Sequence, residues 1–182
     1  MTSISENILT ALGDIVGPDR VLTDADSLLQ YGRDWTRAYT PDAGAVVLPA
    51  TINEVQDIVR LAAKEQIAIV PSGGRTGLSA GAVARNGELV LALDRLNHID
   101  DFNPVDRTVR CGAGVITEQL QQYAEERELF YPVDFASSGS SQIGGNISTN
   151  AGGIKVIRHG MTRDWVAGLK LVTGTGELLD LN

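Results

Sequence analysis

The stretch AVVLPATINEVQDIVRLAAKEQIAIVPSGGRTGLSAG, residues 45–81, decides the fold of this chain. It opens with a short apolar run and continues into residues 51–66, where apolar side chains recur at helical spacing. Thr51 and Glu54 have the spacing of a capping box at the start of that helix. A second apolar run, residues 67–71, follows. The order strand, helix, strand predicts a βαβ unit with parallel strands.

The glycine-rich end of this stretch, residues 71–81, is here named the first glycine segment. It follows the second strand directly, and ligands of α/β sheets lie at the carboxyl ends of strands. Successive glycines let main-chain N–H groups surround an anion, while Thr76 and Ser79 add hydroxyl donors and Arg75 adds a guanidinium suited to phosphate. The dinucleotide fingerprint fails because Ser72 stands where its first glycine belongs, and the P-loop fails for lack of a Lys-Ser/Thr pair. An exposed turn is the alternative interpretation.

A second glycine segment, FYPVDFASSGSSQIGGNISTNAGG, covers residues 130–153. Its apolar residues Ile143 and Ile147 stand among many donors and acceptors, a mixture that suits a ligand made of phosphate, sugar and a flat heterocycle. Apolar residues flank both segments, so neither has the composition of a linker. We therefore expect one ligand site shared by the two segments. The hydroxyl and amide side chains concerned are Ser137, Ser138, Ser140, Ser141, Asn146, Ser148, Thr149 and Asn150.

The rest of the chain predicts an α+β fold in two lobes. A small βαβ lobe, approximately residues 1–72, precedes a mostly antiparallel lobe, residues 73–182, within one domain. The stretch from residue 20 to residue 42 has no clear period and is expected to be irregular. The other predicted elements are a helix over residues 4–15, strands over 88–93 and 107–115, a helix over 116–128 capped by Thr117, and a hairpin over 168–181.

Composition narrows the classes of partner and compartment. The 182 residues are 43% hydrophobic and carry a formal net charge of −8, without the clustered Lys and Arg that bind nucleic acid. No apolar run is long enough to span a membrane, and the first helix, which carries Glu6 and Asp14, does not resemble a signal peptide. The single cysteine, Cys111, cannot form an internal disulfide. These features lead us to expect a cytoplasmic protein.

Three long motifs, in register, carry a resemblance to a known family. They are PATINEVQDIVRLAAKEQIAIVPSGGRTGLSAG (49–81), VDFASSGSSQIGGNISTNAGG (133–153) and HGMTRDWVAGLKLVTGTGELL (159–179). Together they resemble the PCMH-type FAD-binding domain of the vanillyl-alcohol oxidase type. Within that type they are most similar to the FAD-linked D-2-hydroxyacid dehydrogenases, the D-lactate, glycolate and D-2-hydroxyglutarate group.

The resemblance implies which residues bind FAD. The FAD pyrophosphate is expected against Ser72, Gly73, Gly74, Arg75, Thr76, Gly77, Leu78 and Ser79. The pyrophosphate, ribityl and flavin portions are expected against Pro132, Ser138, Ile143, Gly144, Gly145, Asn146, Ser148 and Thr149. Members that tether FAD covalently carry a histidine where Arg75 stands, or a cysteine in the second glycine segment. Because this chain has neither, the resemblance implies non-covalent FAD.

The resemblance also implies a further region after Asn182 with the catalytic and metal-binding histidines. We therefore assign no catalytic residue and no metal ligand here, and expect His98 and His159 to be surface or loop residues. In the stretch 158–165, Arg158, Arg163 and Asp164 either form a structural ion pair, the favoured reading, or orient the cofactor or substrate. Trp35 and Trp165 are expected to be packing anchors.

The expected activity is oxidation of a D-2-hydroxy acid to the 2-oxo acid, with hydride passing to the flavin and electrons to an undefined acceptor. The small-molecule hydroxy acid is the expected partner. Two alternatives stay open. One is a flavin oxidase acting on an alcohol, a sugar or an aldehyde, because one fold hosts many substrates. The other is a non-catalytic nucleotide-binding module.

Overall fold

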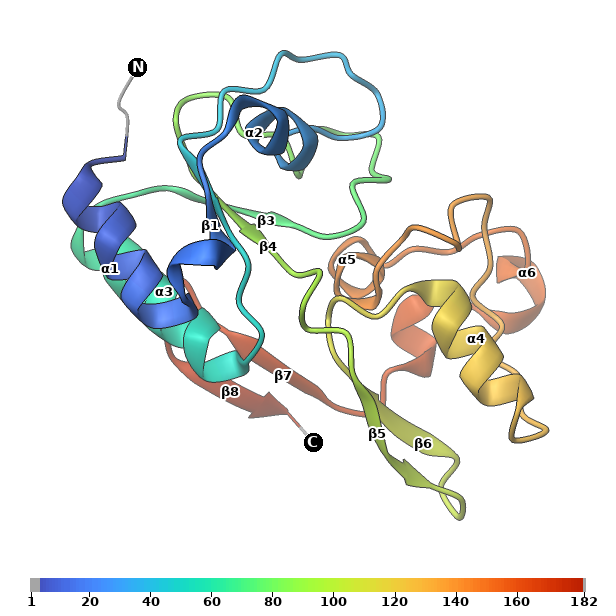
Figure 1. The fold of residues 1–182 in the computed structure, drawn as a ribbon. Coiled ribbons are helices and arrows are strands. Elements are labelled where there is room, and N and C mark those ends of the chain that lie inside the picture. Colours follow the sequence, from blue (N-terminus) through green and yellow to red (C-terminus); the bar gives the residue numbers. More distant parts are fainter. Residues whose placement is uncertain (1–3, 182) are drawn as a thin grey trace.

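The predicted strand–helix–strand unit is present as β2 (Ala45–Val47), α3 (Ile52–Lys64) and β3 (Ile69–Ser72). The computed structural model, drawn in Figure 1, describes residues 4–181. Thr51 caps α3 as expected, because its side chain accepts a hydrogen bond from the Glu54 N–H at 3.2 Å. β2 and β3 run in the same direction, which confirms the parallel βαβ reading.

A fourth strand lies between the two strands of this unit. β4 (Leu89–Ala92) pairs in parallel with both β2 and β3, and β1 (Val21–Leu22) adds an antiparallel edge, so the strand order is β1-β2-β4-β3. We had expected β4 among the antiparallel strands that follow. Every residue of β4 is buried, and a strand buried on both faces takes a central place in a parallel sheet.

Alternate residues of the sheet enter two cores. α1 (Glu6–Val16) and α3 cover one face, where Leu12, Val16, Ala45, Val47, Ile58, Leu89 and Leu91 pack together. α2 (Ala25–Tyr31) contributes to the other face, around Val46, Val90 and Ala92. α1 ends at Val16, close to the end of the predicted helix. The expectation of irregular chain over residues 20–42 was wrong for residues 21–31, which contain β1 and α2, and is confirmed for residues 32–42. Asp24 accepts a hydrogen bond from the Ser27 N–H at 2.9 Å and caps α2, a local signal that short helices rely on.

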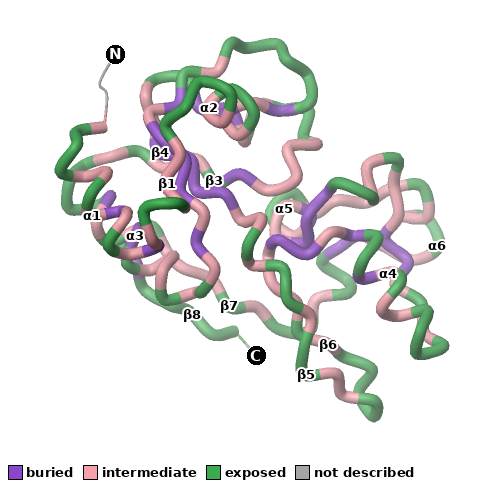
Figure 2. The backbone as a smooth tube through the Cα atoms, in the orientation of Figure 1, coloured by how far each residue is buried: buried purple, intermediate pink, exposed green. Residues whose placement is uncertain are grey.

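The second half of the chain forms two hairpins and several short helices. β5 (Ile99–Asn103) pairs antiparallel with β6 (Thr108–Cys111), and β7 (Leu169–Val172) pairs antiparallel with β8 (Leu178–Leu181) as expected. α4 (Thr117–Glu125) and α5 (Ile143–Thr149) enclose a small core of Val115, Leu120 and Ile143. α6 (Val156–His159) and two 3-10 turns, Pro18–Arg20 and Thr162–Trp165, complete the fold. Figure 2 shows the buried residues concentrated in the sheet and around α5.

Three local expectations need correction or refinement. The cap of α4 is Ile116, while Thr117 is the first helical residue and is buried. The second glycine segment contains α5, a helix that was not among the predicted elements. Trp35 and Trp165 are not packing anchors, because they are 70% and 46% exposed.

Within residues 4–181 no helix combines the length and the apolar character needed to cross a bilayer.

Candidate functional site

The first glycine segment leaves the sheet at the carboxyl edge of β3. Ser72 ends that strand opposite Ala92 of β4, and its carbonyl accepts a hydrogen bond from the Leu93 N–H at 3.0 Å. The buried Ser72 hydroxyl donates to the Tyr31 carbonyl at 3.2 Å, which fixes the strand end to α2. The residues that follow β3 and β4, Asp94 among them, therefore meet at one edge of the sheet, where a ligand of this kind of sheet is expected.

Arg75 is engaged by its neighbours in the protein. Its two terminal nitrogens donate to the two carboxylate oxygens of Asp94 at 3.0 and 3.3 Å. Its guanidinium also lies 4.7 Å from the centre of the Tyr31 ring. The backbone of Arg75 has φ of 57°, in the left-handed region. An anionic ligand would therefore meet Arg75 as one member of an ion pair with Asp94. The anchored side chain of Arg75 also helps to hold the bend in the first glycine segment.

A buried carboxylate clasps the far end of the first glycine segment. Asp34 is 4% exposed, and its Oδ2 accepts a hydrogen bond from the Ala80 N–H at 2.9 Å. Its Oδ1 accepts from the hydroxyl and the N–H of Thr36 at 2.7 and 3.0 Å. The Thr36 hydroxyl, with help from the Ala80 and Thr36 N–H groups, holds the pKa of Asp34 below its usual value although burial opposes this. The Trp35 N–H donates to the Gly77 carbonyl at 3.2 Å, so the chain at 34–36 is tied to both Gly77 and Ala80.

The two glycine segments touch each other, as the hypothesis of a shared site requires. A Cβ at Gly74 would overlap the Ser140 carbonyl oxygen and would lie 2.9 Å from the Ser141 Cα. A Cβ at Gly73 would lie 3.4 Å from Gln142 Oε1. Glycine at position 74 is thus required by the close approach of two backbones. We name this contact, between Gly73 and Gly74 on one side and residues 140–142 on the other, the seam.

α5 divides the predicted cofactor residues of the second segment between two faces. Ile143 and Asn146 point into the protein, where the Asn146 side-chain amide donates to the Thr117 hydroxyl at 2.7 Å. Gly144 packs on Ala113, whose Cβ is 2.7 Å from the position a Cβ would take. The opposite face carries Gly145, Ser148 and Thr149, and the last two are exposed. Only this outer face of α5 is free to contact a ligand with its side chains.

The remaining predicted residues take various positions. Pro132 is buried, and Ser138 is half-buried with its carbonyl accepting a hydrogen bond from the Glu118 N–H at 3.1 Å. In the first segment Thr76 is half-buried, whereas Leu78 and Ser79 are exposed. Leu78 is 70% exposed.

Two glycines close to the seam, Gly77 and Gly145, have open space beside them, as a ligand that lies against the backbone requires. No heavy atom lies within 4 Å of the position a Cβ would take at Gly77 or Gly145, so protein packing does not require glycine there. In a helix glycine costs about 1 kcal/mol relative to alanine, so Gly145 is explained better by something that lies against the backbone. Beside it, the buried Oε1 of Gln142 has no hydrogen-bond partner.

A cluster of metal-ligating side chains is absent from the described part of the chain. Among residues 4–181 no three His, Cys, Asp or Glu side chains gather as a metal site requires. His98 is an exposed residue whose Nε2 lies 3.7 Å from an oxygen of Asp100. In the expected Arg163–Asp164 pair the Nε and Oδ1 atoms are 3.9 Å apart, and both side chains are exposed.

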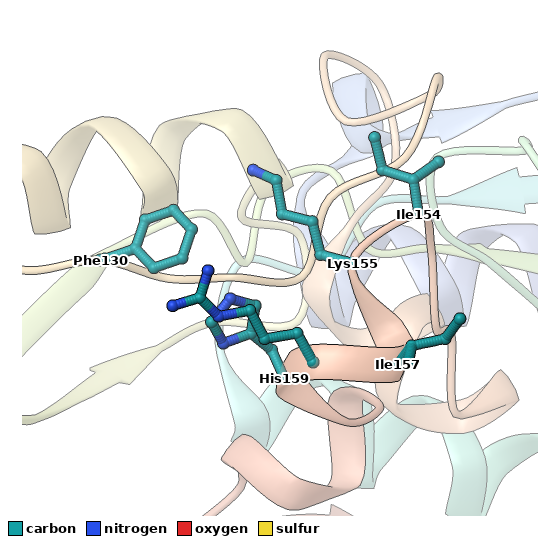
Figure 3. Close-up of a pocket in the computed structure, with 6 residues that line it drawn as sticks. Phe130, Ile154, Lys155, Ile157 and His159 are labelled. Atoms are coloured by element: carbon teal, nitrogen blue, oxygen red, sulfur yellow. The ribbon is translucent and has the colours of Figure 1, made fainter.

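A cavity of about 510 Å³ is lined by none of the predicted FAD-binding residues, although Phe130 of the second glycine segment and Arg158 line it. Figure 3 shows its lining, in which Lys155 points toward Phe130 while the fully exposed Ile157 points away from them. Lys155 pairs with Asp134 at 3.0 Å, and the rings of Phe130 and His159 are 5.7 Å apart. These side chains line a hollow on the surface, and none of the lining residues belongs to the seam.

Comparison with known proteins identifies the family of this chain. The family described as "FAD binding domain" matches residues 43–182, which include both glycine segments. The chain belongs to this family of FAD-binding domains. A solved structure of alkyldihydroxyacetonephosphate synthase has the same fold, with a TM-score of 0.89 over 100% of this chain and 36% of that one, at 19% sequence identity.

Curated relatives are closer in sequence and much longer. D-2-hydroxyglutarate dehydrogenase of Stutzerimonas stutzeri is 62% identical over 175 residues, which are 96% of this chain and 38% of that protein. The mitochondrial D-2-hydroxyglutarate dehydrogenase of Bos taurus is 37% identical over 97% of this chain and 32% of its own length. The chain thus spans about a third of the length of the curated relatives it matches.

The structure marks three supporting residues that the sequence alone did not single out. Asp34 and Asp94 hold the first glycine segment, and Gln142 lies at the seam. Asp94 directly follows the predicted strand 88–93. Because ligands of such sheets lie at strand ends, this position could have marked Asp94 as a candidate site residue. Asp34 had no signal beyond its place in a polar stretch, because its partner at Ala80 is distant in sequence.

Proposed function

We propose that this chain holds FAD at the seam of a flavin-dependent dehydrogenase whose substrate is a D-2-hydroxy acid, with D-2-hydroxyglutarate as the first candidate. The observation that carries the proposal is the 62% identity to a D-2-hydroxyglutarate dehydrogenase over 96% of this chain. The cofactor follows from the FAD-binding family to which the chain belongs. The D-2-hydroxy acid is then a small-molecule partner of the whole protein, and the electron acceptor is left open.

In this proposal the backbone of the first glycine segment surrounds the FAD pyrophosphate. The residues involved are Ser72, Gly73, Gly74, Arg75, Thr76, Gly77, Leu78 and Ser79, with Arg75 acting through its pair with Asp94. The outer face of α5 contacts the cofactor through Gly145, Ser148 and Thr149, while Ile143, Gly144 and Asn146 contribute by holding that helix in place. Pro132 and Ser138 line the approach from the segment before it.

Bound FAD supplies the redox chemistry, since its flavin can accept a hydride from the α-carbon of a hydroxy acid. The chain contributes binding and orientation. We propose that the FAD is held without a covalent bond, because Cys111 lies in β6 outside both glycine segments and burial, with a smaller effect of Asp100, raises the pKa of its thiol to about 11. We also propose one FAD-binding domain with lobes that meet near residue 72, and a cytoplasmic location.

The test uses the full-length gene product. Purified protein is expected to show a flavin absorbance spectrum, and acid precipitation is expected to release the flavin into the supernatant, as non-covalent binding requires. Reduction of an artificial electron acceptor is then measured with D-2-hydroxyglutarate, D-lactate and glycolate, using L-2-hydroxyglutarate as the matched control.

The expected result is turnover of a D-2-hydroxy acid and none of the L-enantiomer. Turnover of alditols, aromatic alcohols or aldehydes alone would replace the proposal with a flavin oxidase or dehydrogenase of another substrate class. Tight FAD binding without turnover of any of these compounds would favour the binding module. Flavin that stays in the protein pellet would overturn non-covalent attachment.

A further inference from the structure

Gln142 is buried at the seam with its side-chain amide unused. The residue is 5% exposed, and its main-chain carbonyl accepts a hydrogen bond from the Asn146 N–H at 3.0 Å. Its side-chain Oε1 is buried without a partner, and within residues 4–181 no hydrogen bond joins either atom of the amide to another residue. A buried carbonyl that gives up water without a replacement loses the full free energy of its hydration.

Unpaired buried acceptors are rare in folded proteins, and each calls for a water, an ion or a ligand that supplies the missing donor. The surroundings of Gln142 favour a ligand. A Cβ at Gly73 would lie 3.4 Å from its Oε1, and the same position is 4.0 Å from the Cα of Gly145. Gly145 borders open space, as the absence of any atom within 4 Å of its own Cβ position indicates. The amide therefore lies between the two glycine segments, below the surface and close to Gly145, whose own Cβ position is open.

We propose that Gln142 is a further cofactor-binding residue, whose side-chain carbonyl accepts a hydrogen bond from a hydroxyl group of FAD. This inference rests on the proposed function. The pyrophosphate oxygens of FAD only accept hydrogen bonds, whereas the sugar-like portions carry O–H donors, so the acceptor Oε1 selects a hydroxyl. Gln142 thus joins the two glycine segments through the ligand.

The test is Gln142→Met in the full-length gene product, because methionine keeps the length and the unbranched shape of glutamine but cannot make these hydrogen bonds. The apoprotein is prepared by removing flavin, its melting temperature is recorded, and FAD is titrated while flavin fluorescence is followed. Loss of a neutral hydrogen bond predicts a rise in the FAD Kd of about three- to tenfold. The apoprotein is expected to melt at the wild-type temperature or above, because an unpaired buried acceptor has been removed.

Gln56→Met is the matched control. The Gln56 side chain donates to the Gly176 carbonyl at 3.0 Å, in a contact between α3 and the β7–β8 turn that involves neither glycine segment. Its replacement is expected to lower the melting temperature and leave the FAD Kd unchanged. Gln142→Leu repeats the main test with a second apolar side chain if the methionine variant is unstable.

Three outcomes are decisive. A raised Kd with an unchanged melting temperature supports the inference. An unchanged Kd with a lowered melting temperature overturns it, because the amide then holds a structural water. If Gln142→Met and Gln142→Leu both leave the FAD Kd and the melting temperature unchanged, the inference is also overturned. Failure of the wild-type protein to bind FAD at all would instead overturn the proposed function, and with it this inference, and is visible before any variant is made.

Discussion

Replacing Gly74 with alanine tests whether the seam is as tight as the structure describes. The added Cβ would overlap the Ser140 carbonyl oxygen and would lie 2.9 Å from the Ser141 Cα. Both obstacles are backbone atoms, which cannot rotate away as the end of a long side chain can. One of the two glycine segments must therefore shift, and the clasp that Asp34 makes with Ala80 limits how far the first segment can move.

Insertion of an extra methyl group into packed protein costs about 1–3 kcal/mol, and backbone on the opposing side places Gly74→Ala in the upper half of that range. In a domain of this size each kcal/mol lowers the melting temperature by about 2–4 °C, so a loss of about 4–12 °C is expected. FAD affinity should fall as well, because the cofactor contacts both sides of the seam.

Gly77→Ala is the matched control in the same segment. Its Cβ meets no atom within 4 Å, and its φ lies outside the left-handed range. Alanine there should leave the melting temperature unchanged, or raise stability by about 0.4–1 kcal/mol through the unfolded chain, while lowering FAD affinity if the cofactor lies against this backbone. Thermal melting of the apoprotein and FAD titration measure both effects. Equal melting temperatures for the Gly74→Ala and wild-type proteins would refute a close backbone contact at the seam.

Three further predictions concern single side chains. Asp94→Asn should lower the free energy of unfolding by about 1–2 kcal/mol, which is less than for a fully buried ion pair because the pair with Arg75 is partly exposed. An unchanged urea unfolding curve would contradict this prediction. Asp34 has a lowered pKa in the folded state, so its contribution to stability is complete above the unfolded value of about 4 and is lost as the pH falls through the folded value. Melting temperatures between pH 3 and pH 7 should therefore fall more steeply on acidification for the wild type than for Asp34→Asn, whereas parallel curves would argue against the clasp. Cys111, whose pKa burial raises to about 11, should react with iodoacetamide at pH 8 about a hundredfold more slowly than a free thiol, and fast labelling of the native protein would contradict its burial.

The sequence predicted the elements whose signals are local. α3 has a capping residue and an apolar stripe within its own residues, so its position followed from spacing alone. The β7–β8 hairpin was likewise visible from its turn. The expectation that the two glycine segments share one site also agrees with the contact of Gly74 with Ser140.

What the sequence did not reveal depends on contacts between distant residues. The position of β4 between β2 and β3 is a choice of pairing partners that no short pattern encodes. α5 was hidden because Gly144 and Gly145 both disfavour a helix, which is held instead by the packing of Gly144 on Ala113 and by the bond from Asn146 to Thr117. Aromatic side chains usually pack, but nothing in the sequence indicated that Trp35 would be exposed.

Because of the strand order, the first glycine segment also forms part of the connection between two paired parallel strands. Adjacent parallel strands require a crossover connection, and this connection usually contains a helix. Residues 73–88 form the crossover from β3 to β4, and they contain no helix. The connection that completes the middle of the sheet is therefore the one proposed to hold the cofactor. Shortening it would detach the central strand, whereas the exposed turn between β5 and β6 can lengthen freely. A ligand that binds the folded crossover also favours assembly of the sheet by mass action, so a higher cofactor concentration would raise the folded fraction of this domain.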